Sequence, residues 1–324
     1  MTLWQRWLGA AALGLTALSA HAAPAAEFPT RPITLIVPNA PGGAVDILAR
    51  LLSDKLQARL GQNIIVLYKP GAGTVLGTDV VARAEPDGHT LGMVVTSHVI
   101  NPSLRTNMPF DTQKDLAGVS LLASSQIVIT ASPELGARTL PDILALAKAD
   151  PQRISYASPG SGSSMHMAGE LLKGMAGVEM MHVPFKGAGP AYPEVISGRV
   201  SLLIDPLFSS LPHIQSGRLV PVAVTGPKRD PALPDVPTVA EVLPGFEVQS
   251  VFGVVAPAGT PPATLDTLSQ AFGAVLAMPD IQERLAQIGM TPIGTTPKAF
   301  DAYIREEIAK WAPVVKRSGA QVDG

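Results

Sequence analysis

The sequence contains no cysteine. This absence excludes disulfide bonds, thiolate metal ligands and cysteine nucleophiles, so burial of the core must stabilise the 324-residue chain. An excess of basic charge is also missing, because 24 lysine and arginine residues face 26 aspartate and glutamate residues, and the net charge is −2. Proteins that bind nucleic acids carry basic surfaces. The composition therefore predicts no nucleic-acid partner.

Long apolar runs are scarce too, and the N-terminal one is too short to span a bilayer comfortably. Arg6 precedes an uncharged run over residues 8–20, and the small residues Ala20 and Ala22 flank His21. This pattern is typical of a secretory signal peptide. We expect residues 1–22 to be removed by cleavage near Ala22, which predicts Sec export and a periplasmic location. Later apolar runs end at proline, glycine or charge before they reach membrane-spanning length.

Short apolar runs alternate with amphipathic segments along the rest of the chain. This alternation predicts an α/β protein with mostly parallel sheets flanked by helices. The runs at 33–38, 63–68 and 90–95 barely alternate in polarity, which favours strands buried on both faces. Further strands are expected at 126–131, 154–157, 178–183, 200–204, 220–224 and 251–256. Helices are expected at 45–60, 74–84, 140–149, 163–176, 190–197, 207–215, 261–277, 280–288 and 297–316. The proline-rich stretch 227–244 is expected to be irregular.

The length of the chain favours two sheets over one. We expect strands near 121–130 and 246–256 to cross between two lobes and to form a hinged cleft. Lobe 1 would comprise residues 27–125 and 251–324, because the C-terminal helices are expected to return to the N-terminal sheet. Lobe 2 would comprise residues 126–250.

Three glycine-rich turns each follow a strand and open a helix, at 39–44 (NAPGGA), 71–77 (GAGTVLG) and 158–164 (SPGSGSS). Glycine allows close backbone approach, and the first N–H groups of a helix are unpaired donors at the positive end of its dipole. Such turns bind anions at the carboxyl ends of strands. Their spacing matches neither the P-loop nor G-x-G-x-x-G, which argues against a nucleotide.

Catalysis and metal binding find less support in the sequence. A secreted serine hydrolase would use Ser161 or Ser163 with His166, but neither serine is centred in G-x-S-x-G. His166 is either structural or a direct or water-mediated ligand contact. His166 and Glu170 share a helical face without a further ligand at metal-binding spacing, so we expect no metal and no cofactor. Asp205 ends an apolar strand, where it either caps the next helix or faces a ligand.

Five segments together resemble the Bug family, the periplasmic solute receptors of tripartite tricarboxylate transporters. They are PTRPITLIVPNAPGGAVDILAR (29–50), KPGAGTVLGTDVVARAEPDGHTL (69–91), ISYASPGSGSSMHMAGELLKGMAGVEMMHVPFKGAGPA (154–191), PDVPTVAE (234–241) and VVAPAGTPP (254–262). The resemblance runs from residue 28 to about residue 319. It implies a two-lobed Venus-flytrap receptor without catalysis, which delivers a small carboxylate ligand to the membrane subunits of the transporter. The expected ligand is a dicarboxylate, an acidic amino acid or an aromatic acid, and the sequence leaves these three classes open. The receptor is expected to be a monomer. A periplasmic sensor for a kinase remains an alternative.

The resemblance also implies where the ligand binds. Loops 38–44 and 158–164 would hold a carboxylate through backbone N–H groups, small hydroxyls and water, and Asp46 would fix the first loop. Tyr68, His89 and Asn39 depart from the residues usual in the family. The distal end of the ligand would meet residues 96–98, Asp205 and the 207–208 region. The predicted ligand-binding residues are Pro38, Asn39, Ala40, Gly42, Gly43, Ala44, Asp46, Thr96, Ser97, His98, Ser158, Gly160, Ser161, Gly162, Ser163, His166, Asp205 and Phe208.

Overall fold

The computed structural model describes residues 28–185 and 187–320, and the predicted signal peptide lies outside them. The strands are β1 (Ile33–Val37), β2 (Ile64–Tyr68), β3 (Thr90–Val95), β4 (Leu116–Ala131), β5 (Ser155–Ser158), β6 (Met181–Pro184), β7 (Leu202–Pro206), β8 (Val220–Val224), β9 (Gln249–Pro257) and β10 (Met290–Pro292). The helices are α1 (Ala44–Leu60), α2 (Val75–Ala82), α3 (Ser97–Leu104), α4 (Leu140–Ala149), α5 (Ser164–Ala176), α6 (Ala191–Ile196), α7 (Leu207–Gln215), α8 (Pro262–Leu276), α9 (Pro279–Gln287) and α10 (Pro297–Ser318). In this part of the chain, no helix is both long and apolar enough to cross a bilayer.

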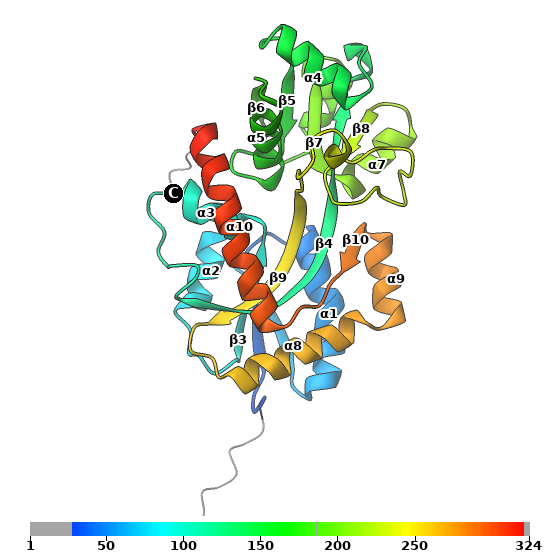
Figure 1. Ribbon diagram of the computed structural model, residues 1–324. Helices are drawn as coiled ribbons and strands as arrows, with labels where there is room; N and C mark the ends of the chain where they lie inside the picture. Colours follow the sequence, from blue (N-terminus) through cyan, green and yellow to red (C-terminus); the bar gives the residue numbers. More distant parts are fainter. Residues whose placement is uncertain (1–27, 186, 321–324) are drawn as a thin grey trace, which may run out of the picture.

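The protein has two lobes, and the long strand β4 runs through both (Figure 1). The strand order is β2-β1-β3-β9-β4-β7-β5-β6, with β10 and β8 also paired to β4. The first part of β4 pairs antiparallel with β9, and its end pairs antiparallel with β7 and β8. Strands β1, β2 and β3 are parallel in lobe 1, as are β5, β6 and β7 in lobe 2. The predicted α/β two-lobed architecture is confirmed, whereas its residue boundaries stay a prediction. The expectation of two separate sheets is wrong, because β4 pairs with β9 and with β7 and so joins all the strands into one ten-stranded sheet.

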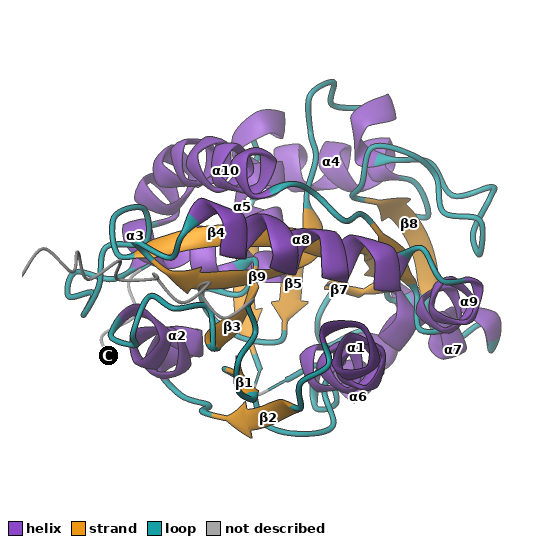
Figure 2. Ribbon diagram, turned by 90° about the horizontal axis from the view of Figure 1, so that it is seen from below, coloured by secondary structure: helices purple, strands orange, loops and turns teal. Residues whose placement is uncertain are grey.

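Lobe 1 buries apolar residues on both faces of its sheet. Along β1, Leu35 joins the cluster that contains Leu48 and Leu52 of α1, whereas Ile36 points to the opposite face and joins the cluster that contains Val81 of α2. Figure 2 shows α1 and α2 on opposite sides of this part of the sheet. Successive strand residues face opposite sides, so a continuous apolar run is required here. The prediction of two buried faces holds for β1 and β3.

The helix that follows β1 begins and ends where its sequence indicates. Asp46 lies in the first turn of α1, and Arg59 lies in the last. Gly61 caps the C-terminus in the left-handed conformation (φ 68°), and its N–H donates to the carbonyl of Gln57. Glycine adopts this conformation without the steric cost that a Cβ imposes.

Five elements differ from the sequence-based expectations. Strand β2 lies at the edge of the sheet and alternates between half-buried and exposed residues, because α1 and β1 cover only one side of it. The short helix α3 and strand β10 were not expected. Strand β6 begins at Met181 because the chain first turns at Gly177, the left-handed cap of α5.

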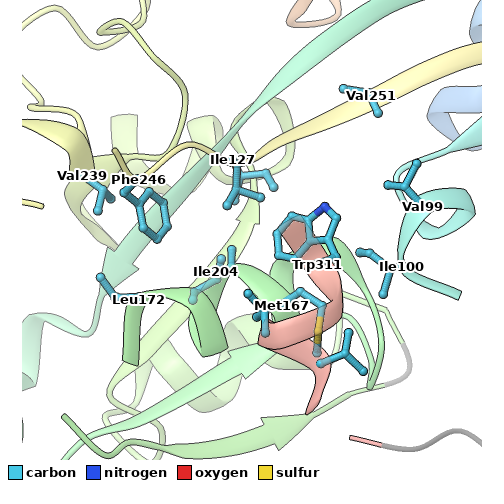
Figure 3. Close-up of a cluster of buried hydrophobic side chains, with 14 of the residues drawn as sticks. Val99, Ile100, Ile127, Met167, Leu172, Ile204, Val239, Phe246, Val251 and Trp311 are labelled. Carbon is cyan, nitrogen blue, oxygen red and sulfur yellow. The ribbon is translucent and has the colours of Figure 1, made fainter. Parts of the chain in front are cut away.

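The fifth difference concerns α10, which does not stop at lobe 1. It packs on α3 and β4, and its end reaches α5 of lobe 2 (Figure 1). A helix of 22 residues is about 33 Å long. Trp311 of α10 is fully buried in a cluster with Ile127, Met167 and Ile204 (Figure 3). The C-terminal helix therefore connects the cores of both lobes.

Candidate functional site

A cleft of about 530 Å³ lies between the lobes. Its walls come from the loops and helix starts that follow β1, β2, β3, β5 and β7, and from the start of β9. The lining residues are Asn39, Gly43, Ala44, Val45, Gly73, Thr74, Val95, Thr96, Ser97, Asn101, Leu104, Arg105, Pro159, Gly160, Ser161, Gly162, Ser163, Ser164, Met165, Pro206, Phe208, Ser250, Val251 and Phe252. All three glycine-rich turns thus open into one space.

The N-termini of four helices face this cleft, those of α1, α3, α5 and α7. No side chain caps the first turn of α1 or of α3. Their first N–H groups lack intrahelical partners and lie at the positive ends of the helix dipoles. Among the described lining residues there is no aspartate or glutamate, and Arg105 alone is charged. The cleft is therefore suited to an anion.

The first loop is held from behind by Asp46. Its Oδ2 accepts the N–H of Gly42 at 2.7 Å, while the hydroxyl of Tyr68 and the guanidinium of Arg50 both donate to Oδ1. The hydrogen bond from Tyr68 is the main cause that lowers the pKa of Asp46, followed by the Gly42 N–H. Asp46 is therefore ionised at neutral pH, and it fixes the left-handed Gly42 (φ 90°) without lining the cleft.

The second loop is held by hydrogen bonds of its own and by His166. The Gly162 N–H donates to Nδ1 of His166 at 3.0 Å, and the Ser163 hydroxyl donates to the carbonyl of Gly160 at 2.7 Å. Ser163 also caps α5 by accepting the N–H of His166. Gly160 and Gly162 both have positive φ, a conformation that favours glycine.

His166, which is buried, stacks on the half-buried ring of His182 beside this loop. Its ring lies 3.8 Å from that of His182, whose Nε2 is 2.7 Å from the Ser158 hydroxyl. Burial lowers the pKa of both imidazoles to about 4, so both are neutral at pH 7. Because Nδ1 of His166 accepts a hydrogen bond, its proton lies on Nε2. The acceptor nitrogen is thus engaged by the loop backbone rather than by a serine hydroxyl.

The structure brings some of the predicted site residues together in the cleft and leaves the others behind it. Those that line the cleft are Asn39, Gly43, Ala44, Thr96, Ser97, Gly160, Ser161, Gly162, Ser163 and Phe208. Those outside its lining are Pro38, Ala40, Gly42, Asp46, His98, Ser158, His166 and Asp205. His98 is buried in α3, and burial lowers its pKa to about 4. In the described ranges, no three His, Asp or Glu side chains assemble to hold a metal ion.

Several lining residues were missed by the sequence analysis. Gly73 and Thr74 belong to the glycine-rich turn at 71–77, which is not among the predicted ligand-binding residues. Asn101, Leu104 and Arg105 come from α3 and its end, which no pattern had indicated. The order strand, glycine turn and helix could have assigned residues 71–77 to the cleft. The sequence of α3 contains no comparable signal.

Asp205 is fully buried beside the cleft. Its Oδ2 accepts the hydroxyl of Tyr192 at 2.7 Å, and Oδ1 has no partner in the described part of the chain. Burial raises its pKa to about 7. The charged form is therefore disfavoured in the folded state, and the carboxyl is partly protonated near neutral pH.

Asp205→Asn is expected to stabilise the protein by up to about 4 kcal/mol above pH 7, since the pKa of the carboxyl is raised from 3.8 to about 7. The folded-state pKa is raised, so the penalty for the charged form is complete above about pH 7. This penalty becomes smaller as the pH falls toward the pKa of the unfolded state, which is near 4. The stabilisation by Asp205→Asn should vanish at that pH. Urea unfolding of both proteins at pH 5 and pH 8 measures it. An equal difference in free energy at both pH values would contradict the raised pKa.

The sequence matches the family described as "Tripartite tricarboxylate transporter family receptor" over residues 48–320. The chain is similar to three solved structures that cover it almost completely. Periplasmic binding protein BugD is 33% identical, with a TM-score of 0.75 over 91% of this chain and 99% of that one. Rpa4515 of R. palustris, solved with adipate, is 33% identical, with a TM-score of 0.78 over 91% and 100% of the two chains. MatC of Rhodopseudomonas palustris, with bound malate, is 31% identical, with a TM-score of 0.75 over 89% and 100%.

Proposed function

This chain belongs to the tripartite tricarboxylate transporter receptor family, whose members are periplasmic solute-binding proteins, and on that premise we propose that it captures a small organic carboxylate between its two lobes. The observation that carries this proposal is the meeting of four helix N-termini in a cleft whose described lining has no acidic side chain. Loops 38–44 and 158–164 supply the backbone donors. The similar proteins solved with adipate and malate support a carboxylate as the ligand.

The residues behind the loops serve as positioning residues in this proposal. Asp46 fixes Gly42, and His166 fixes Gly162, so each loop presents its N–H groups in a set geometry. Because the loops are already ordered, binding of an anion carries no entropic cost of ordering them. Both positioning residues keep the required state at pH 7, because Asp46 is ionised and His166 is neutral.

Closure of the lobes would follow from binding. The ligand would contact lobe 1 through the N-terminus of α1 and lobe 2 through the N-terminus of α5. It therefore binds more tightly to the state of the protein in which these two N-termini are close together. The closed receptor would then deliver the ligand to the membrane subunits of a tripartite tricarboxylate transporter. In keeping with the sequence pattern, we propose that it acts in the periplasm as a monomer after removal of residues 1–22.

A hydrolytic function is less well supported by the geometry. The Ser163 hydroxyl donates to the Gly160 carbonyl, and the acceptor nitrogen of His166 is occupied by the Gly162 N–H. A serine nucleophile needs its general base within hydrogen-bond reach and free to accept the proton. We therefore propose a binding protein rather than an enzyme.

We expect saturating carboxylate to reduce the radius of gyration of the mature protein in small-angle X-ray scattering. Isothermal titration with adipate, malate, glutamate and benzoate identifies the ligand to use, and a raised melting temperature in its presence supports binding to the folded state. Binding of none of these acids would contradict the carboxylate proposal. Binding with an unchanged radius would contradict closure alone.

A further inference from the structure

Arg105 adds a positively charged side chain to the cleft, beside the backbone N–H donors. It follows α3, lines the cleft, and forms no hydrogen bond or ion pair through its guanidinium with any residue in 28–185 or 187–320. Its Nε is buried without a partner. A guanidinium is always charged and has five donors to satisfy. A charge in a partly enclosed site is unfavourable unless it is paired, so an anionic group bound beside Arg105 would stabilise it.

The glycine-rich turn at 71–77 lies against this side chain. A Cβ on Gly73 would lie 3.0 Å from Nη2 of Arg105, so glycine leaves the room that the guanidinium occupies. The amide of Asn101 donates to the carbonyl of Gly73 at 2.9 Å and ties the turn to α3. Ala72 (φ 46°) and Thr74 (φ 82°) adopt positive φ, which strains non-glycine residues. Such strain persists where the surrounding structure enforces it, and one of the two strained residues, Thr74, lines the cleft.

The guanidinium and the backbone donors come from different elements. The donors of the carboxylate site are the starts of α1 and α5, whereas Arg105 stands at the far end of α3. The rise of an α-helix places its backbone about 12 Å along the axis from Ser97, at the start of α3. One carboxylate held by the two loops leaves Arg105 available for a second anionic group. A planar guanidinium matches a carboxylate with two parallel hydrogen bonds.

We propose that Arg105 binds the second carboxylate of a dicarboxylate ligand, and that Gly73 and Asn101 position it. This inference rests on the proposed function, because the first carboxylate is the one assigned to loops 38–44 and 158–164. It narrows the ligand from any small organic acid to a dicarboxylate. Arg105 thereby acts as the specificity-determining residue of the cleft.

The test compares acids that differ only in the second carboxylate. Succinate with butyrate, adipate with hexanoate, and terephthalate with benzoate form matched pairs, and titration calorimetry identifies the dicarboxylate that binds tightest. Arg105→Met should lower the affinity for that dicarboxylate by about 30-fold or more, the typical effect of losing charge-assisted hydrogen bonds. It should leave the affinity for the matching monocarboxylate within about twofold. Arg105→Lys, which keeps the charge but loses the fork, should fall between the two.

Arg59→Met is the matched control, because Arg59 is an exposed residue of α1 outside the cleft lining and its loss changes the net charge equally. Equal losses for the mono- and dicarboxylate would assign Arg105 to the first carboxylate and overturn the proposal. Unchanged dicarboxylate binding in Arg105→Met, or a wild type that prefers the monocarboxylates, would overturn it too. A wild type that binds no acid of any pair would instead remove the proposed function. Unchanged thermal unfolding of the variant shows that the comparison concerns binding.

Discussion

Ala44→Asp should lower the affinity for carboxylate ligands by about 100-fold or more, because two like charges close together cost several kcal/mol. Ala44 is the first residue of α1 and lines the cleft. The aspartate would occupy the site of the ligand and take its N–H donors. The fold should not suffer, because an acidic residue in the first turn of a helix contributes about 0.3–1 kcal/mol of stability. Titration calorimetry and thermal unfolding should therefore change in opposite directions.

Two control variants separate charge from other effects of this substitution. Ala44→Asn has nearly the shape of the aspartate without its charge, and should lose much less affinity. Ala299→Asp places the same charge in the exposed first turn of α10, outside the cleft lining, and should bind as the wild type does. Wild-type affinity in Ala44→Asp would show that the start of α1 does not hold the ligand.

The parts of the site that depend on local sequence could be predicted. A strand, a glycine turn and a helix start are encoded within about fifteen residues, and loops 39–44 and 158–164 both reach the cleft. The buried leucines of α1 and its C-terminal cap at Gly61 could also be predicted, because they too follow from the local sequence. Their structure follows from neighbours in the chain, so no long-range contact needs to be known.

Residues whose role depends on a distant partner could not be assigned from the sequence. Asp205 has the residue type and strand-end position of a ligand contact, yet its carboxyl pairs with Tyr192 away from the cleft lining. His166 lies beside the predicted loop, but it stacks on His182 outside the cleft lining. The partner decides which way such a side chain turns, and the sequence does not reveal the partner.

Arg105 was missed for a related reason. Helix α3 has eight residues and contains Pro102, so its intrinsic stability is low and its pattern is weak. Packing against α10, nearly 200 residues further along the chain, stabilises it. A helix made by tertiary contacts cannot be recognised from its own residues, and the residue that it presents to the cleft is missed with it.

Trp311→Ala should destabilise the protein by about 3–5 kcal/mol, the usual cost of removing a large aromatic side chain from a core. The indole is fully buried, and its N–H donates to Oε2 of Glu307 at 2.8 Å. It packs with Ile127 of β4, Met167 of α5 and Ile204 of β7 (Figure 3). Urea unfolding with a fluorescence-independent signal such as circular dichroism measures the loss. A loss below about 1 kcal/mol would contradict a close-packed core around the indole.

The position of Trp311 between the lobes adds an effect that a core residue of one lobe cannot have. Phe272 of α8 is a buried aromatic residue that serves as a control, because its cluster lies within lobe 1 and includes residues of β1, β3, β9 and α1. Phe272→Ala should therefore cost a similar free energy of unfolding without altering how the lobes are held. In Trp311→Ala the cavity lies between α10 and lobe 2, so the ligand-free protein should show a larger radius of gyration. An equal radius in both variants would mean that β4 and β9 alone fix the arrangement of the lobes, and that α10 adds stability but no restraint on closure.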